Sequence, residues 1–489
     1  MKYLKSKAHI ITLLGILFSS QIHAQWQSFW QPLSTGLQHS FAFGMGSCLA
    51  MTTYNGKLIV GGNFTSAGGN VNYNNIAAWD GTNWSNLGST GLNTPNLLDA
   101  AANLSKCSYY NENSIGPWVG AMLVYNNELY AAGSFTRADG LPVNNIAKWN
   151  GSAWSDVGGG VQISNPNPTL QLKPYIHGMI VYQNELYVTG AFNQAGATTA
   201  LNIAKWNGAN WSAVGGGLDT TLLWDHGEVM TIYNNKLVVG GAFTTAGNVA
   251  VNNIAEWNGS TWSAMGPGIP ANQTQYAGVT DLGVHNNILY AGNISTGISA
   301  WNGSSWSTVG GGLSAAAFTN LSTTQGLIAG GAFGAAGNTQ NVGGIAIYNG
   351  VNWNHLYVSC LSNYSGLGCI NALCFYNGFL YAGGDFNSEI CNPNVPLRKI
   401  ARLISPLSLS ENVINESNLK IYPSPAQSEI SLDDIFTNTK VEIYDMQGIN
   451  VFSGIYQNSI DVSSFASGIY LLAVEMDGYR KTNRFMILR

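Results

Sequence analysis

The stretch TLLWDHGEVM holds the closest grouping of side chains that could carry out chemistry, because Asp225, His226 and Glu228 fall within four residues. His177 stands ahead of an apolar run at a similar place in the preceding repeat. A carboxylate beside an imidazole can transfer protons or bind a metal ion. The grouping matches no known catalytic motif, and Asp219 is the only other acid nearby. We therefore assign no catalytic residue, metal or cofactor from the sequence and keep these residues only as candidates.

Four aromatic residues form a second candidate group, Trp118, Tyr175, Trp224 and Tyr276. Each is predicted to lie in a connection between strands. Aromatic rings exposed in such connections can stack on sugar rings or anchor a protein partner, so these residues are predicted to bind ligand. The alternative is that they cap the hydrophobic core, in which case their substitution would reduce stability.

The elements that would position these side chains form a repeat of four strands. In one copy, AMLVY is followed by the turn NN, ELYAAGSF, the loop TRADGLPVN, NIAKW, the turn NG and AWSDVG. Apolar positions alternate along the strand segments, as expected of half-buried strands. Asn-Asn and Asn-Gly tolerate the positive φ that two-residue hairpin turns require. The repeat therefore predicts a series of antiparallel four-stranded sheets.

Third strands outnumber fourth strands by one. Seven third strands end at Trp79, Trp149, Trp206, Trp257, Trp301, Tyr348 and Leu403. Six fourth strands begin at Trp84, Trp154, Trp211, Trp262, Trp306 and Trp353. The missing one matches the N-terminal segment around Trp30, so we expect that segment to pair beside Leu403 and close a seven-bladed β-propeller. Six or eight blades would follow if the short fifth copy does not form one blade of its own.

The run GGNFTSAGGNVNYNNIAAWDGTNWSNLG and its copies resemble kelch-type propellers. They are still more similar to the repeats of fungal bud-site cortical marker proteins and of many bacterial secreted proteins. The resemblance covers most of the predicted propeller, residues 25–404. It implies a fold and nothing about activity, because propellers carry many unrelated functions.

Turn lengths predict two unlike faces of the propeller. The first-to-second and third-to-fourth connections are nearly all two residues long and share one face, whereas the other connections are longer and variable. Variable loops on a rigid scaffold are the usual carriers of binding, so the face with the long connections is the predicted binding face.

Composition and the first residues indicate an exported protein. Charged residues make up only 9% of the chain and the formal net charge is −5, which argues against binding to nucleic acid. A basic start, the apolar run IITLLGILF and IHA before Gln25 predict a signal peptide over residues 1–24. No later segment approaches the roughly 18 apolar residues of a transmembrane helix.

Six cysteines stand near the two ends of the predicted propeller, at Cys48, Cys107, Cys360, Cys369, Cys374 and Cys391. In a ring, the last blade abuts the first, so all six would flank the closure. We therefore expect disulfides that reinforce it, with connectivity left open. A zinc site is a poorer interpretation, because Cys369 and Cys374 lack the paired spacing and histidine partners of such sites.

The C-terminal residues 419–489 follow a polar linker, residues 405–418, and predict a small antiparallel domain, a β-sandwich. They resemble the type A sorting domain of the type IX secretion system of Gram-negative bacteria. The matching residues are Tyr422, Pro423, Pro425, Asp445, Gly448, Ser467, Gly468 and Tyr470, with Ser424 in place of the commoner Asn. The resemblance implies interaction with the type IX machinery, export across the outer membrane, removal of this domain, and a location outside the cell or on its surface.

The prediction for function is a secreted or surface-held propeller that binds a glycan or a surface protein and is not an enzyme. A polysaccharide hydrolase or lyase with its site at the channel mouth is the main alternative. A structural component of a surface layer or of gliding machinery is a third.

Overall fold

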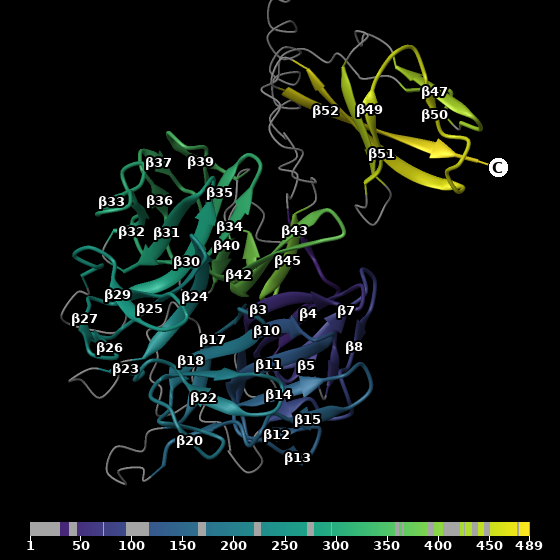
Figure 1. Ribbon diagram of the computed structural model, residues 1–489. Coiled ribbons are helices and arrows are strands. Elements are labelled where there is room, and N and C mark those ends of the chain that lie inside the picture. Colours follow the sequence, from purple (N-terminus) through teal and green to yellow (C-terminus); the bar gives the residue numbers. More distant parts are fainter. Residues whose placement is uncertain are drawn as a thin grey trace, which may run out of the picture. The chain divides into compact units, whose positions relative to one another are not determined.

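The computed structural model describes residues 30–38, 46–71, 73–93, 117–164, 173–219, 226–270, 278–294, 296–356, 361–363, 366–389, 396–403, 421–424, 426–432, 439–444, 450–476 and 479–488 (Figure 1). All regular structure within these ranges is β-strand, as expected. The chain divides into two compact units, Met1–Leu409 and Ser410–Arg489. The predicted signal peptide lies outside the described residues.

Seven antiparallel sheets of four strands dominate the described part of the first unit. Their first strands are β3 (Ser47–Tyr54), β10 (Trp118–Tyr125), β17 (Tyr175–Tyr182), β24 (Gly227–Tyr233), β30 (Val279–His285), β34 (Ala317–Thr323) and β42 (Cys369–Tyr376). The second strands are β4 (Lys57–Asn63), β11 (Glu128–Ser134), β18 (Glu185–Ala191), β25 (Lys236–Gly241), β31 (Ile288–Asn293), β35 (Gly326–Gly331) and β43 (Phe379–Asp385). The third strands are β7 (Ile76–Trp79), β14 (Ile146–Trp149), β21 (Ile203–Trp206), β28 (Ile254–Trp257), β32 (Gly297–Trp301), β38 (Ile345–Tyr348) and β45 (Ile400–Leu403). The fourth strands are β8 (Trp84–Ser85), β15 (Trp154–Asp156), β22 (Trp211–Ala213), β29 (Trp262–Ala264), β33 (Trp306–Thr308), β39 (Trp353–His355) and β1 (Trp30–Pro32).

The N-terminal strand completes the last sheet. Strand β1 pairs with β45, with Trp30 opposite Leu403 and Pro32 opposite Ala401. The first strands also touch one another in chain order, and β42 of the last sheet contacts β3 of the first. In Figure 1 the green strands of the last sheet accordingly lie beside the purple strands of the first. The predicted pairing of the Trp30 segment with the final repeat is confirmed.

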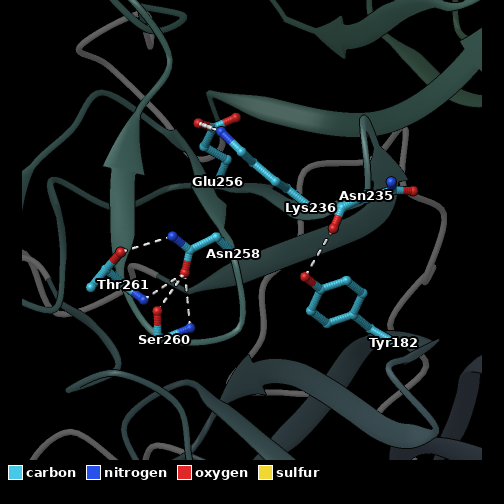
Figure 2. A network of polar contacts seen from close by, with 7 residues as sticks. All are labelled: Tyr182, Asn235, Lys236, Glu256, Asn258, Ser260 and Thr261. Carbon is cyan, nitrogen blue, oxygen red and sulfur yellow. Dashed lines mark hydrogen bonds and ion pairs between the residues drawn. The ribbon is translucent and has the colours of Figure 1, made fainter.

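Two-residue turns form the hairpins between first and second strands. Asn126 and Asn127 adopt φ of 50° and 61°, which confirms the prediction of positive-φ turns. A tyrosine at the end of one first strand reaches the turn of the next sheet: in Figure 2, the Tyr182 hydroxyl donates to the Asn235 carbonyl at 3.1 Å. The Tyr376 hydroxyl donates in the same way to the Gly56 carbonyl at 2.9 Å, which joins the last sheet to the first.

The third-to-fourth turns contain four residues, since Trp149 pairs with Trp154 around residues 150–153, so the prediction of two-residue turns is wrong there. An asparagine or aspartate holds each of these turns at its first position. In the turn drawn in Figure 2, the Asn258 side-chain oxygen accepts from the amides of Ser260 and Thr261, both at 2.9 Å. The flanking tryptophans pack as ring pairs, with Trp257 and Trp262 centroids 5.1 Å apart. The repeated tryptophans therefore pack against each other within their sheets.

The longer connections are more ordered than the sequence suggested. The predicted loop TRADGLPVN contains two short strands, β12 (Arg137–Ala138) and β13 (Leu141–Pro142), and β12 pairs with β9 (Leu92–Asn93), which follows the preceding sheet. Main-chain hydrogen bonds therefore join one sheet to the next. The other short strands are β2 (Leu37–Gln38), β5 (Ser66–Ala67), β6 (Asn70–Val71), β16 (Val161–Gln162), β19 (Gln194–Ala195), β20 (Thr198–Thr199), β23 (Leu218–Asp219), β26 (Thr245–Ala246), β27 (Val249–Ala250), β36 (Ala335–Ala336), β37 (Thr339–Gln340), β40 (Leu361–Asn363), β41 (Gly366–Leu367) and β44 (Ser388–Glu389).

A buried asparagine before the third strand ties two connections together. Asn145 has φ of 65°, its side-chain oxygen accepts from the Phe135 amide at 3.3 Å, and its side-chain nitrogen donates to the Val161 carbonyl at 2.9 Å. Asn75, Asn202 and Asn253 make the equivalent pairs of bonds. These residues explain why the repeat carries an asparagine before Ile-Ala.

The second unit contains two small sheets around one core. Its strands are β46 (Ile421–Tyr422), β47 (Glu429–Leu432), β48 (Lys440–Tyr444), β49 (Asn450–Ile455), β50 (Ile460–Asp461), β51 (Gly468–Met476) and β52 (Tyr479–Ile487). The order is β46-β47-β50 in one sheet and β49-β48-β51-β52 in the other. Residues from both sheets, among them Ile430 and Leu472, share a single apolar cluster.

Candidate functional site

A β-bulge interrupts all seven first strands at the equivalent position. The extra residues are Leu49, Gly120, His177, Glu228, Thr280, Phe318 and Asn371. All seven line one cavity of about 230 Å³ that the first strands surround. Bulges redirect a side chain from its regular place in the strand, so these seven residues form a ring that faces the cavity. We call them the bulge ring.

Two members of the bulge ring, His177 and Glu228, meet a third ionisable residue, His226. The Nε2 atom of His226 lies 2.9 Å from Oε2 of Glu228, and Nδ1 of His177 lies 3.7 Å from Oε1 of the same carboxylate. One ligand atom from each of the three residues falls within 4.8 Å of the other two. All three side chains are buried. We call this group the His–Glu cluster.

Aromatic rings enclose the His–Glu cluster. The Tyr175 hydroxyl lies 3.3 Å from Nδ1 of His226, and the imidazoles of His177 and His226 are stacked with centroids 5.2 Å apart. The Trp118 ring lies 5.0 Å from that of His177. Because Trp118, Tyr175 and His226 each stand two residues before a bulge, they form a second layer at the same end of the first strands.

The predicted candidates are thus partly brought together. His177, His226 and Glu228 meet, whereas Asp219 lies at an exposed position on β23. Asp225 lies outside the described residues. The cluster could bind a metal ion through two imidazoles and a carboxylate, or it could transfer a proton between Tyr175, His226 and Glu228.

The expectation of exposed aromatic residues is wrong for Trp118 and Tyr175. They begin strands β10 and β17 and are only 3% and 6% exposed. With Leu49 they form a small apolar cluster, which corresponds to the capping role weighed as the alternative. Trp224 and Tyr276 lie outside the described residues.

Sequence inspection missed the other members of the bulge ring. Thr280 donates from its hydroxyl to the Ala317 carbonyl at 2.6 Å, and the Asn371 side-chain nitrogen donates to the Cys48 carbonyl at 3.1 Å. Nothing in a single repeat marks these positions. A signal exists only in the comparison of all repeats, where the bulge position carries a different residue each time.

The cysteines match the expected disulfides only in part, at Cys369. Cys48 and Cys374 are free thiols, so the expectation of disulfides at these two positions is wrong. Cys48 is buried against the Gly383 backbone at the contact between the first and last sheets and packs as a small apolar side chain. Cys369 is disulfide-bonded. Cys107, Cys360 and Cys391 lie outside the described residues.

The described motif residues of the C-terminal unit lie in or next to strands β46 and β51. Gly468 begins β51, and Tyr470 is buried, with its hydroxyl donating to the Ala466 carbonyl at 3.0 Å and its ring 5.8 Å from that of Phe485. Tyr422 ends β46 and its side chain is half exposed, at 48%. Pro423 follows it in the bend after the strand. Pro425, Asp445 and Gly448 lie outside the described residues.

The solved structures that are similar to this chain include two from B. thetaiotaomicron. The extracellular domain of the hybrid two component system BT4673 is 9% identical, with 94% of this chain and 59% of that chain covered and a TM-score of 0.44. The extracellular domain of the hybrid two component system BT3049 is also 9% identical, with 92% and 57% covered and a TM-score of 0.42. The chain therefore spans less than two thirds of the length of either.

Comparison with sequence families identifies the C-terminal unit. No curated protein sequence matches the chain. Residues 420–488 match the family described as the secretion system C-terminal sorting domain, which implies interaction with the type IX secretion system. Within the described ranges, no helix has the length and apolarity needed to cross a bilayer. Residues 420–488 therefore belong to the secretion system C-terminal sorting domain family, and the protein is secreted or held at the outer cell surface.

Proposed function

We propose that residues 30–403 form a seven-bladed β-propeller in which each four-stranded sheet is one blade. The cyclic order of contacts between first strands supports this, because β42 returns to β3. The pairing of β1 with β45 supplies main-chain hydrogen bonds between the two ends of the array. Further support comes from Tyr376, which donates to Gly56, and from Asn371, which donates to Cys48.

The propeller acts outside the cell as a binding module, and its site is the cavity inside the bulge ring. The observation that carries this proposal is the contrast between positions within the repeat. Third strands repeat Ile-Ala-x-Trp in several copies, whereas the seven bulge positions hold seven different residue types. Packing that recurs in every repeat favours similar residues in each copy, whereas a site for one asymmetric ligand requires different ones. We therefore assign ligand binding to the bulge ring and a structural role to the repeated strand positions.

The size and chemistry of the cavity favour part of a glycan as the ligand. Its volume of about 230 Å³ lies below the roughly 300–1,000 Å³ of pockets that enclose drug-sized molecules. A chain end or a single sugar unit fits such a cavity, and a folded protein surface does not. Polar groups of His177, Glu228, Thr280 and Asn371 line it, and these can accept and donate hydrogen bonds to hydroxyl groups.

Export agrees with this assignment. The sorting domain places the protein where polysaccharides of the cell surface and the surroundings are found.

A glycan array probed with the secreted protein tests the proposal, followed by calorimetry on each array hit. We expect Thr280→Val and Asn371→Leu to weaken binding at least tenfold, since each removes polar groups from the cavity. Thr308→Ala, on the exposed strand β33, is the matched control and should bind as the wild type does. Binding only to surface proteins, or glycan binding that survives both cavity substitutions, would contradict the proposal.

A polysaccharide hydrolase or lyase is the second candidate, and the contacts of Tyr175 and Glu228 with His226 favour it. A tyrosine, an imidazole and a carboxylate in one chain of hydrogen bonds can remove and return protons. Release of shorter products from an array hit, abolished in Glu228→Gln, would identify an enzyme. Unchanged substrate after prolonged incubation would leave binding as the function.

A further inference from the structure

We propose that His177, His226 and Glu228 bind one divalent transition-metal ion, with Zn²⁺ the best match. The inference goes beyond the proposed function, since it holds whether or not the cavity binds a glycan. It rests on the geometry, burial and donor types of the His–Glu cluster and on the residues that orient it.

The three donor atoms are already gathered at the scale of a coordination sphere. Bonds of about 2.0–2.1 Å in a tetrahedral site place neighbouring donors roughly 3.3 Å apart. The distances between donor atoms of His226 and Glu228 and of His177 and Glu228, 2.9 and 3.7 Å, fall on either side of that value. Since the three donors all lie within 4.8 Å of one another, the site needs only small side-chain movements to close around an ion.

The backbone holds two of the ligands in place. His177 and Glu228 are the bulge residues of β17 and β24, strands that pack side by side in neighbouring sheets. His226 directly precedes β24, and its carbonyl accepts from the Ala242 amide at 2.9 Å. The positions are therefore fixed by strand pairing and do not depend on a loop that must fold around the ion.

The donor set selects the class of metal. Two imidazoles and one carboxylate suit Zn²⁺ and its transition-metal neighbours, whereas Ca²⁺ and Mg²⁺ require oxygen ligands almost exclusively. Burial acts in the same direction, because a buried carboxylate is costly unless a positive charge or hydrogen bonds compensate it. A bound dication would neutralise Glu228 and leave one positive charge.

Surrounding residues orient the two histidines for binding. The Tyr175 hydroxyl can accept a hydrogen bond from Nδ1 of His226. Nε2 of His226 then shares a proton with Glu228 when no ion is bound, and loss of that proton frees the Nε2 lone pair for the metal. The ring of His177 lies between those of Trp118 and His226, at centroid distances of 5.0 and 5.2 Å, which limits its rotation. Three protein ligands, of which His177 and Glu228 line the cavity, leave a fourth position for water or a ligand oxygen, as in catalytic zinc sites.

Metal titration of the secreted protein, prepared without a polyhistidine tag and stripped with a chelator, tests the site. We expect one Zn²⁺ per chain in a competition assay against a fluorescent chelator, and a rise in the melting temperature. His226→Gln and Glu228→Gln should each weaken Zn²⁺ binding at least 100-fold. Tyr175→Phe keeps all three ligands and should weaken it about 10-fold, the loss typical when an outer hydrogen bond to a ligand is removed.

His355 supplies the matched control, because it stands exposed on β39, away from the cluster. His355→Gln should bind Zn²⁺ as the wild type does. Should His226→Gln or Glu228→Gln fail to fold, Co²⁺ bound to the wild type gives an independent readout, since a tetrahedral site yields an intense visible absorption band. Wild-type binding no tighter than that of a His177→Gln/His226→Gln double variant, or a Co²⁺ spectrum typical of the hydrated ion, would overturn the proposal.

Discussion

Substitution of Asn145 tests how the connections of neighbouring repeats are held. Its side chain bridges the Phe135 amide and the Val161 carbonyl, at 3.3 and 2.9 Å, and the residue is 5% exposed. The sixth sheet shows what the position tolerates, because Gly344 stands there with φ of 82° and keeps the equivalent main-chain bond to Phe333 at 2.9 Å. The backbone path thus survives without the side chain, although the two side-chain bonds do not.

The magnitude follows from those contacts. Leaving a buried amide and a buried carbonyl without partners costs roughly 1–3 kcal/mol each. Asn145→Gly should therefore lower the free energy of unfolding by about 2–6 kcal/mol. Asn145→Ala should cost up to about 1 kcal/mol more, because alanine is strained at positive φ by more than the extra flexibility of glycine costs in the unfolded chain.

Thermal unfolding measures the effect of backbone strain at residue 145, and hydrogen exchange measures the loss of the side-chain bridge. The melting temperature should fall in the order wild type, Asn145→Gly, Asn145→Ala, and the Phe135 amide should exchange faster in both variants. An alanine variant as stable as the glycine variant would refute the account of backbone strain. Unchanged exchange at Phe135 would refute the role of the side-chain bridge.

Three further predictions concern the closure, the thiols and acid stability. Trp30→Ala removes a fully buried ring and should cost about 3–5 kcal/mol in unfolding experiments; an unchanged melting temperature would show that β1 contributes little. Burial raises the pKa of Cys48, and it raises that of Cys374 to about 11, so iodoacetamide at pH 8 should label neither thiol quickly until denaturant is added, as mass spectrometry would reveal. Partial burial raises the pKa of Asp139, but hydrogen bonds from residues 89–90 lower it by more, so the pKa lies below the usual 3.8. The stability that this carboxylate contributes is therefore present above pH 3.8 and lost as the pH falls through the lower folded value; Asp139→Asn should flatten the loss of melting temperature below about pH 4, and an identical acid profile would contradict it.

Local patterns in the sequence were sufficient to predict the main strands, the first-to-second turns and the pairing of β1. The turn at Asn126 and Asn127 could be identified because positive φ is a property of the two residues themselves. The partner of Trp30 could be identified by counting strands, because the seventh repeat ends at Leu403 without a fourth strand of its own. The first inference depends only on the residues of the turn, and the second only on the number of strands in each repeat.

The direction of the site residues could not be predicted in the same way. A bulge breaks the period of two, so His177 and Glu228 face the cavity although simple alternation does not assign them to it. The burial of Trp118 depends on Tyr175 and Leu49 from other sheets, and no local pattern contains those neighbours. The sequence does not distinguish the free Cys48 from a disulfide-forming cysteine, because Cys48 packs against the last sheet, which is distant in the chain.

The pairing of β1 with β45 also has a consequence for synthesis and export. A polypeptide that emerges N-terminus first delivers Trp30 long before Leu403 exists as a partner. Throughout that interval β1 lacks its partner strand. After β45 has formed, its edge stays open until β1 pairs with it. A second copy at high local concentration could fill either position, because the sequences are identical and the hydrogen bonds are the same. Rapid overproduction should therefore yield strand-exchanged dimers, whereas slow emergence favours each molecule closing on itself.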